Sequence, residues 1–198
     1  ISGILPIALK ARVEKFEKII VPSQNAKEAG LVKKLQVYAG NTLREVVDFL
    51  NETHSLEKVE TDFDSLEKDE DYLLDFSTIR GQQNLKRAAI IAVAGGHNML
   101  FVGTPGSGKT MISRSLPSIF PDLTFEEALE LTKIYSVANQ LGQNQSVISR
   151  RPFRSPHHTA STIAIIGGGK NPRPGEVSLS HRGVLFLDEF PEFSSFTL

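Results

Sequence analysis

The sequence predicts an α/β fold with parallel sheets, divided into two domains by an acidic segment. Residues 1–50 alternate short apolar runs with amphipathic stretches, the order expected of a parallel βαβ unit. Residues 78–198 contain two more apolar runs, and each leads directly into residues suited to holding a charged ligand. Residues 51–77 carry ten acidic and two basic residues, a charge density that disfavours a packed core. We therefore expect a linker there, with three apolar side chains docking at its end: Leu73, Leu74 and Phe76.

Length and composition exclude several classes of protein. The 198 residues are enough for one complete domain and part of a second. The chain has no cysteine, which excludes disulfides and thiolate metal sites and leads us to expect a cytoplasmic protein. The longest apolar run, residues 88–96, is too short to cross a bilayer, and no signal-peptide pattern precedes it, so no membrane association is expected. Because the chain begins at Ile1 and not at methionine, we expect it to be a piece of a longer protein.

The first domain is expected to contain helices and strands in alternation. "PIALKARVEKF" predicts an amphipathic helix with Ile7, Ala11 and Phe16 near one face. "KIIVP", closed by Pro22, and "LQVYA" predict two short strands, and the helix between them makes their pairing parallel.

Two pairs of residues in this domain have capping-box spacing. Asn25 and Glu28 predict the start of a short helix, and Thr42 and Glu45 predict the start of a second one. The second helix would carry a single apolar stripe, made of Leu43, Val46, Val47 and Leu50.

The second domain is expected to open with the helix "QQNLKRAAIIAVAGG", ended by Gly95 and Gly96, followed by a buried strand, "NMLFVG". "TFEEALELTKIYSVANQLG" predicts a long helix that begins with the capping box of Thr124 and Glu127 and stops at Gly142. "GVLFLDEF" predicts another buried strand with acidic residues at its C-terminal end.

"GTPGSGKT" has the spacing G-x-x-x-x-G-K-[ST] and lies between a predicted apolar strand and a predicted helix, so it predicts a phosphate-binding loop. Its glycines let consecutive backbone N–H groups surround an anion. Lys109 is expected to contact the β- and γ-phosphates of ATP, and the Thr110 hydroxyl to bind Mg²⁺. The expected nucleotide-binding residues are Gly103, Thr104, Pro105, Gly106, Ser107, Gly108, Lys109 and Thr110.

The second half of this site is expected in "VLFLDEF". Residues 184–187 can be buried on both faces as a central parallel strand, so Asp188 emerges at its carboxyl end, where open α/β sheets bind ligands. Asp188 can hold Mg²⁺ through water, and Glu189 can polarise the attacking water. The predicted catalytic residues are therefore Lys109 and Glu189.

Longer stretches resemble the magnesium-chelatase-like AAA+ proteins of the YifB/ComM family. They are "GQQNLKRAAIIAVAGGHNMLFVGTPGSGKT", "RPFRSPHHTAS" and "IGGGKNPRPGEVSLSHRGVLFLDEFPEF". The resemblance implies a three-layer P-loop AAA+ core over 78–198, cut after the Asp-Glu pair. It also implies that the arginine finger, sensor strand and helical lid lie beyond Leu198. Residues 1–50, through "GILPIALKARVEKFEKIIVPSQNAKEA", resemble the last part of the family's Lon-protease-like (S5-like) domain.

The resemblance also implies a function. Members are similar to hexameric ring motors, and ComM-type members are associated with branch migration of DNA during natural transformation. The alternative is a chelatase-like ATPase regulator or assembly factor without nucleic acid, although the chelatase subunit lacks such an N-terminal domain. A Lon-like protease is a third alternative, but no serine nucleophile can be assigned beside Lys10, which is expected to be solvated.

"TASTIAIIGGG" fits the start of a helix that breaks at Gly167, Gly168 and Gly169. "GGGKNPRPG", residues 167–175, resembles the insertion that this clade carries in its second helix, directed toward the ring pore. Lys170 and Arg173 are its only charges, and we expect them to contact DNA phosphates. They belong to a stretch, 150–182, with six basic residues and one acidic residue. A solvated loop is the alternative.

The adjacent His157 and His158 are expected at the end of the strand "PFRSPHH", on opposite faces. That placement disfavours a shared metal ion and favours hydrogen bonding that fixes the strand end. A role in sensing nucleotide or in contacting a neighbouring subunit is the alternative.

Overall fold

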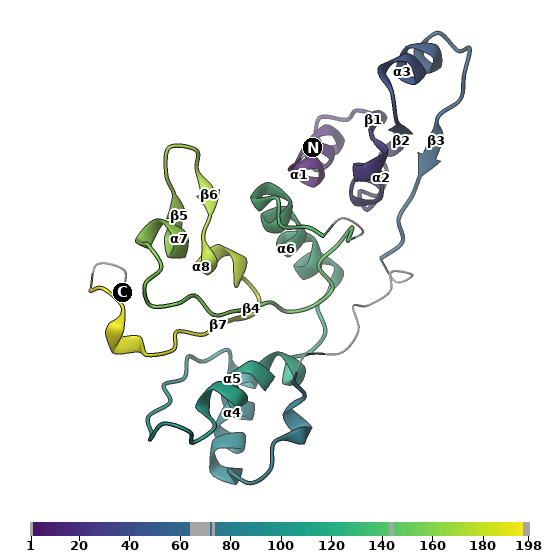
Figure 1. The fold of residues 1–198 in the computed structure, drawn as a ribbon. Helices are drawn as coiled ribbons and strands as arrows, with labels where there is room; N and C mark the ends of the chain where they lie inside the picture. The colour runs from purple at the N-terminus through teal and green to yellow at the C-terminus, as the bar shows by residue number, and fades with distance from the viewer. Residues whose placement is uncertain (1, 64–71, 73, 143–144, 196–198) are drawn as a thin grey trace. The chain divides into compact units, whose positions relative to one another are not determined.

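The computed structural model describes residues 2–63, 72, 74–142 and 145–195 (Figure 1). Its contacts divide the chain into two compact units, and each is described by itself. The first comprises Ile1–Lys68 and Phe125–Ile148, and the second comprises Asp69–Thr124 and Ser149–Leu198. Within the described residues, no helix has the length and apolarity that crossing a membrane would require.

The first unit is built on the predicted parallel βαβ motif. Strand β1 (Lys18–Pro22), helix α2 (Ser23–Ala29) and strand β2 (Gln36–Gly40) follow one another, and β1 pairs with β2 in parallel. A third strand, β3 (Glu57–Val59), pairs antiparallel with β2 on its other side. This strand lies in the acidic segment, where we expected only a linker, and it forms because β2 leaves a free edge for three residues to pair with.

The first helix, α1 (Ile4–Val13), forms as predicted but buries a different face. Its buried side chains are Ile4, Leu5 and Ala8, whereas Ile7 is 49% exposed and Phe16 63% exposed. The helix packs against α2 and against α6 (Phe125–Ala138), and this packing selects the face. The sequence contains two apolar faces of similar width, so its period alone cannot choose between them.

The two predicted capping boxes have different outcomes. Thr42 precedes helix α3 (Leu43–Leu50), and its Oγ1 accepts a hydrogen bond from Glu45 N at 3.2 Å, as predicted. The Glu45 carboxylate accepts from Asn41 N, and this bond lowers the pKa of Glu45. The stripe of α3 remains largely exposed, with Leu43 79% exposed.

The box at Asn25 and Glu28 does not form, because α2 already begins at Ser23, directly after Pro22. Glu28 is instead buried, and its Oε1 accepts hydrogen bonds from Leu5 N at 3.1 Å and from Ser136 Oγ at 2.5 Å. The carboxylate thereby joins α1, α2 and α6 of the first unit.

Helix α6 was expected to belong to the second domain, but its contacts place it in the first unit. The helix also ends at Ala138, before Gly142, because Asn139 adopts a left-handed conformation with φ 56°. A contact unit need not coincide with a domain, so the domain boundaries remain a prediction.

The second unit has its own apolar core. Helix α4 (Gln83–Gly95) ends at Gly96, which has φ 64°, as the glycine pair predicted. It packs with the short helices η1 (Phe76–Thr78), α5 (Lys109–Ser115) and η2 (Leu116–Ile119). The buried members of this cluster are Phe76, Ile79, Ala89, Ile112 and Leu116. The predicted docking is confirmed for Phe76, Leu74 is half-buried, and Leu73 lies outside the described residues.

The sheet of the second unit is much shorter than predicted. Strands β4 (Phe153–Arg154) and β7 (Val184–Leu185) pair in parallel, as expected, but residues 184–187 are only half-buried. Residues 98–103 form no strand, and no described residue pairs with them in a ladder. Their side chains still alternate between the core and solvent. Met99 and Phe101 pack on the core cluster, while Leu100 and Val102 are 78% and 88% exposed. The expectation of a buried strand at 98–103 was therefore wrong, because a segment without flanking strands is covered on one side only. The expectation that residues 184–187 are buried on both faces was wrong as well, since they are half-buried.

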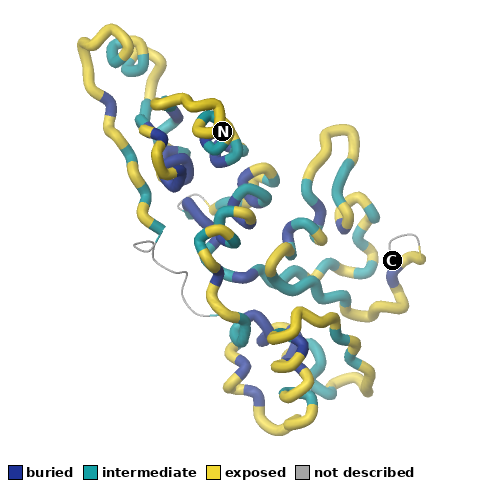
Figure 2. Tube along the Cα trace, turned by 180° about the vertical axis from the view of Figure 1, so that it is seen from behind, coloured by how far each residue is buried: buried dark blue, intermediate teal, exposed yellow. Residues whose placement is uncertain are grey.

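The segment between the two strands of this sheet contains a hairpin. Helix α7 (Thr162–Ile166) breaks at the glycines, as predicted, and β5 (Gly167–Gly168) pairs antiparallel with β6 (Arg173–Pro174). Helix α8 (Glu176–Leu179) then leads to β7, and η3 (Phe190–Glu192) follows the acidic pair. The tip of the hairpin projects from the two helices and is exposed (Figures 1 and 2).

Candidate phosphate-binding site

The phosphate-binding loop is folded around its own lysine. Lys109 is the first residue of α5, and its Nζ donates to the carbonyl oxygens of Gly103 and Thr104, each at 2.8 Å. Gly106 and Gly108 have φ of 76° and 87°, values that residues with a Cβ rarely adopt, so the turn depends on them. The ammonium therefore lies at the mouth of the loop, where a phosphate bound to the loop would meet it.

Thr110 and Asp188 come together although they are 78 positions apart in the chain. Thr110 Oγ1 donates to Asp188 Oδ2 at 3.3 Å, which brings the hydroxyl of α5 to the residue that follows the β7 segment. A hydroxyl and a carboxylate, both open to solvent, form a donor set that suits Mg²⁺, which usually keeps several waters and takes one or two protein oxygens. No group of three His, Cys, Asp or Glu side chains gathers to hold a metal among the residues described.

Glu189 is fixed at both its backbone and its side chain. Its N–H donates to Asp188 Oδ1 at 3.0 Å, and its backbone is left-handed with φ 53°. Its Oε2 lies 3.2 Å from His158 Nδ1, although 65% of the glutamate side chain is exposed. The predicted site residues Lys109, Thr110, Asp188 and Glu189 therefore lie at adjoining ends of α5 and β7.

The prediction for the two histidines was wrong in its geometry. Strand β4 ends at Arg154, so His157 and His158 fall in the turn after it, where strand alternation no longer applies. Their rings lie side by side, with centroids 4.1 Å apart. His157 Nδ1 accepts from Thr159 N at 3.3 Å, while His158 reaches Glu189. The sequence pattern around the histidines does not indicate this second contact. The only signal that could have suggested it is the acidic residue after the β7 segment.

The basic stretch does not form one surface. Arg151 is buried and donates to the carbonyls of Pro121 and Arg182, at 2.7 and 2.9 Å. Arg154 forms a bidentate salt bridge with Glu176, from Nε to Oε2 at 2.5 Å and from Nη2 to Oε1 at 2.6 Å, which joins β4 to α8. Lys170 and Arg173 are exposed on the hairpin, outside the cluster formed by the other site residues.

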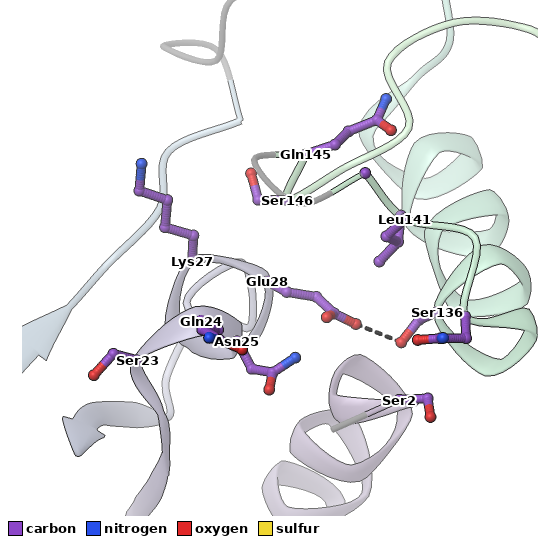
Figure 3. Close-up of a pocket in the computed structure, with 12 residues that line it drawn as sticks. Ser2, Ser23, Gln24, Asn25, Lys27, Glu28, Ser136, Leu141, Gln145 and Ser146 are labelled. Atoms are coloured by element: carbon purple, nitrogen blue, oxygen red, sulfur yellow. Dashed lines mark hydrogen bonds between the residues drawn. The ribbon is translucent and has the colours of Figure 1, made fainter. Parts of the chain in front are cut away.

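Each unit has a cavity of its own. In the second unit, a cavity of about 810 Å³ is bordered by Thr110, Met111 and Arg114 of α5 and by Tyr72 and Phe153. In the first unit, a polar cavity of about 570 Å³ contains the Glu28–Ser136 hydrogen bond (Figure 3). The Glu28 carboxylate is occupied in holding helices together.

Comparison with known sequences identifies the family. Residues 75–198 match the family described as "Magnesium chelatase, subunit ChlI". Competence protein ComM of Haemophilus influenzae is 45% identical over 201 residues, covering 98% of this chain and 38% of ComM. The YifB proteins of Salmonella typhimurium and Escherichia coli are 43% and 42% identical, each covering 100% of this chain. The chain spans 38% of the length of each of these relatives. It belongs to the magnesium-chelatase-like ATPase family of the ComM and YifB proteins.

Proposed function

We propose that this chain binds ATP with Mg²⁺ and hydrolyses it as part of an AAA+ ring motor. The observation that carries the proposal is the 3.3 Å hydrogen bond between Thr110 and Asp188. The phosphate-binding loop and the Asp-Glu pair are far apart in the sequence, and this bond brings them together at the mouth of the loop that holds Lys109. A surface Asp-Glu pair with no such role would have no reason to lie against the phosphate-binding loop.

Each residue then has a defined task. Lys109 would exchange its two loop carbonyls for the β- and γ-phosphates, which are stronger partners for an ammonium. Thr110 and Asp188 would hold Mg²⁺, and the ion would neutralise charge on the phosphates. Glu189 would polarise the attacking water. The cavity of about 810 Å³ beside Thr110 is within the range of small-molecule sites and has room for the base and ribose.

We further propose that the motor works on DNA in the cytoplasm, as a hexamer of the complete protein. Support comes from the printed name of ComM, a competence protein, and from the two exposed cations on the hairpin. The proposed domains are a Lon-protease-like part at 1–50, a linker at 51–77 and the AAA+ core at 78–198.

A second candidate is an ATPase regulator or assembly factor without nucleic acid. The family description favours it, since it names a chelatase subunit. The internal contacts of Arg151 and Arg154 also leave fewer cations for DNA than the sequence suggested. Stimulation of ATP turnover by forked DNA would separate the two candidates.

The test of the ATPase assignment is Glu189→Gln in the complete protein. The amide cannot polarise water as a carboxylate does, whereas Asp188 still holds Mg²⁺, so ATP should bind at near wild-type affinity and turnover should stop. Lys10→Ala is the control, because Lys10 is exposed and pairs only with Glu14 among the interactions shown for it. Equal loss of binding and turnover would show that the roles of the two carboxylates are assigned wrongly.

A further inference from the structure

The ring of His158 is held on two sides by aromatic neighbours. The His157 ring lies against it, with centroids 4.1 Å apart and planes inclined at 35°. Phe193, which is buried, meets it edge-on at 6.5 Å and 82°. Only 27% of the His158 side chain is exposed. A ring fixed in this way can direct one nitrogen at a chosen partner with little loss of conformational entropy on making the contact.

The partner of this nitrogen is the carboxylate that we assign to water activation. His158 Nδ1 lies 3.2 Å from Glu189 Oε2. An ionised carboxylate only accepts hydrogen bonds, so this contact is a hydrogen bond when the ring carries a proton on Nδ1. The contact uses one carboxylate oxygen and leaves Oε1 for a water molecule.

Glu189 needs such a restraint. Its side chain is 65% exposed, and apart from His158 the contacts shown for the residue are made by its backbone: its N–H donates to Asp188 Oδ1, and its carbonyl oxygen accepts from Glu192 N. A glutamate in water samples several rotamers, and a base must lie within hydrogen-bond reach of the proton it accepts. An error of about 1 Å in such a group costs on the order of 10²-fold in rate.

We infer that His158 is a positioning residue: it holds the Glu189 carboxylate through Oε2 so that Oε1 can polarise the attacking water. The inference rests on the proposed ATPase function. Under this inference, the two histidines neither bind a metal ion nor serve to fix the end of the strand. His157 supports the ring, and His158 carries the contact.

The first test replaces His158 in the complete protein. His158→Ala should lower kcat about 10- to 100-fold, as loss of an orienting hydrogen bond does elsewhere, and leave the Kd for ATP within about twofold. His158→Asn keeps an N–H near the position of Nδ1 and should recover part of kcat. The control is His54→Ala, an exposed histidine of the first unit. Circular dichroism would establish that each variant is folded.

The second test combines His158→Ala with Glu189→Gln. If the histidine acts through the glutamate, the double variant should have the residual turnover of Glu189→Gln alone, because the two residues form one unit. Losses that multiply, an unchanged or raised kcat in His158→Ala, or no recovery in His158→Asn would overturn the inference. If Glu189→Gln loses turnover and His158→Ala does not, the inference about His158 is overturned and the proposed function stands. If Glu189→Gln keeps wild-type turnover, the proposed function is overturned as well.

Discussion

Two glycine-rich loops of the second unit carry cations in opposite ways. In the phosphate-binding loop, Lys109 is folded onto the carbonyls of Gly103 and Thr104, so its charge is directed inward. In the hairpin, Lys170 and Arg173 are exposed, and Pro172 and Pro174 stiffen the second arm. An inward cation suits a small ligand that the backbone can surround. Outward cations on a stiff arm suit an extended polyanion, so the two loops differ in the kind of anion that they can bind.

The largest effect is expected for Lys109→Ala in the complete protein. No other Lys or Arg side chain is shown at the loop among the described residues, so ATP binding or hydrolysis should be abolished. Titration with a fluorescent ATP analogue and a phosphate-release assay would measure both. Turnover equal to that of the Lys10→Ala control would refute the site.

A large effect is also expected from isolating residues 1–198. The family resemblance implies that AAA+ subunits complete each other's sites with an arginine from beyond residue 198, and such an arginine contributes about 10³-fold or more in rate. Phosphate release by the purified chain should therefore be negligible beside that of the complete protein. Robust turnover by the isolated chain would contradict the requirement for a ring.

A smaller effect is expected when Lys170 and Arg173 are both replaced by alanine. Affinity for DNA should fall, and the slope of log K against log salt should become shallower by about 1.4 to 1.8, since about two phosphate contacts are lost. Fluorescence anisotropy at several salt concentrations would measure this slope. An unchanged slope would mean that the hairpin does not contact phosphates.

The smallest effect is expected at the base of the hairpin. Gly167 has φ 102°, and a Cβ there would lie 2.7 Å from Arg173 O, so Gly167→Ala should destabilise the hairpin by about 1–3 kcal/mol. Gly168 has a similar φ of 108° but open space around it, so Gly168→Ala should cost less. Thermal unfolding of both variants would give the difference. Equal costs would show that backbone conformation alone decides the effect.

Local signals were predictable from the sequence, and contacts between distant segments were not. The cap at Thr42, the parallel β1–β2 pair and the break of α7 at Gly167 each depend on a few neighbouring residues. The buried role of Glu28 depends on Ser136, 108 positions away, which no local spacing records. The phosphate-binding loop has a sequence pattern, whereas the pairing of His158 with Glu189 arises only when β4 and β7 align.

The most direct test of the division between the two loops is ATP turnover of the complete protein, with and without forked DNA, in three forms. The wild type should hydrolyse ATP with Mg²⁺ and respond to DNA, and Lys109→Ala should do neither. The Lys170→Ala/Arg173→Ala variant should keep basal turnover and lose the DNA response. A DNA response at the wild-type level in this last variant, or turnover that survives loss of Lys109, would contradict the assignment of ATP to one loop and DNA to the other.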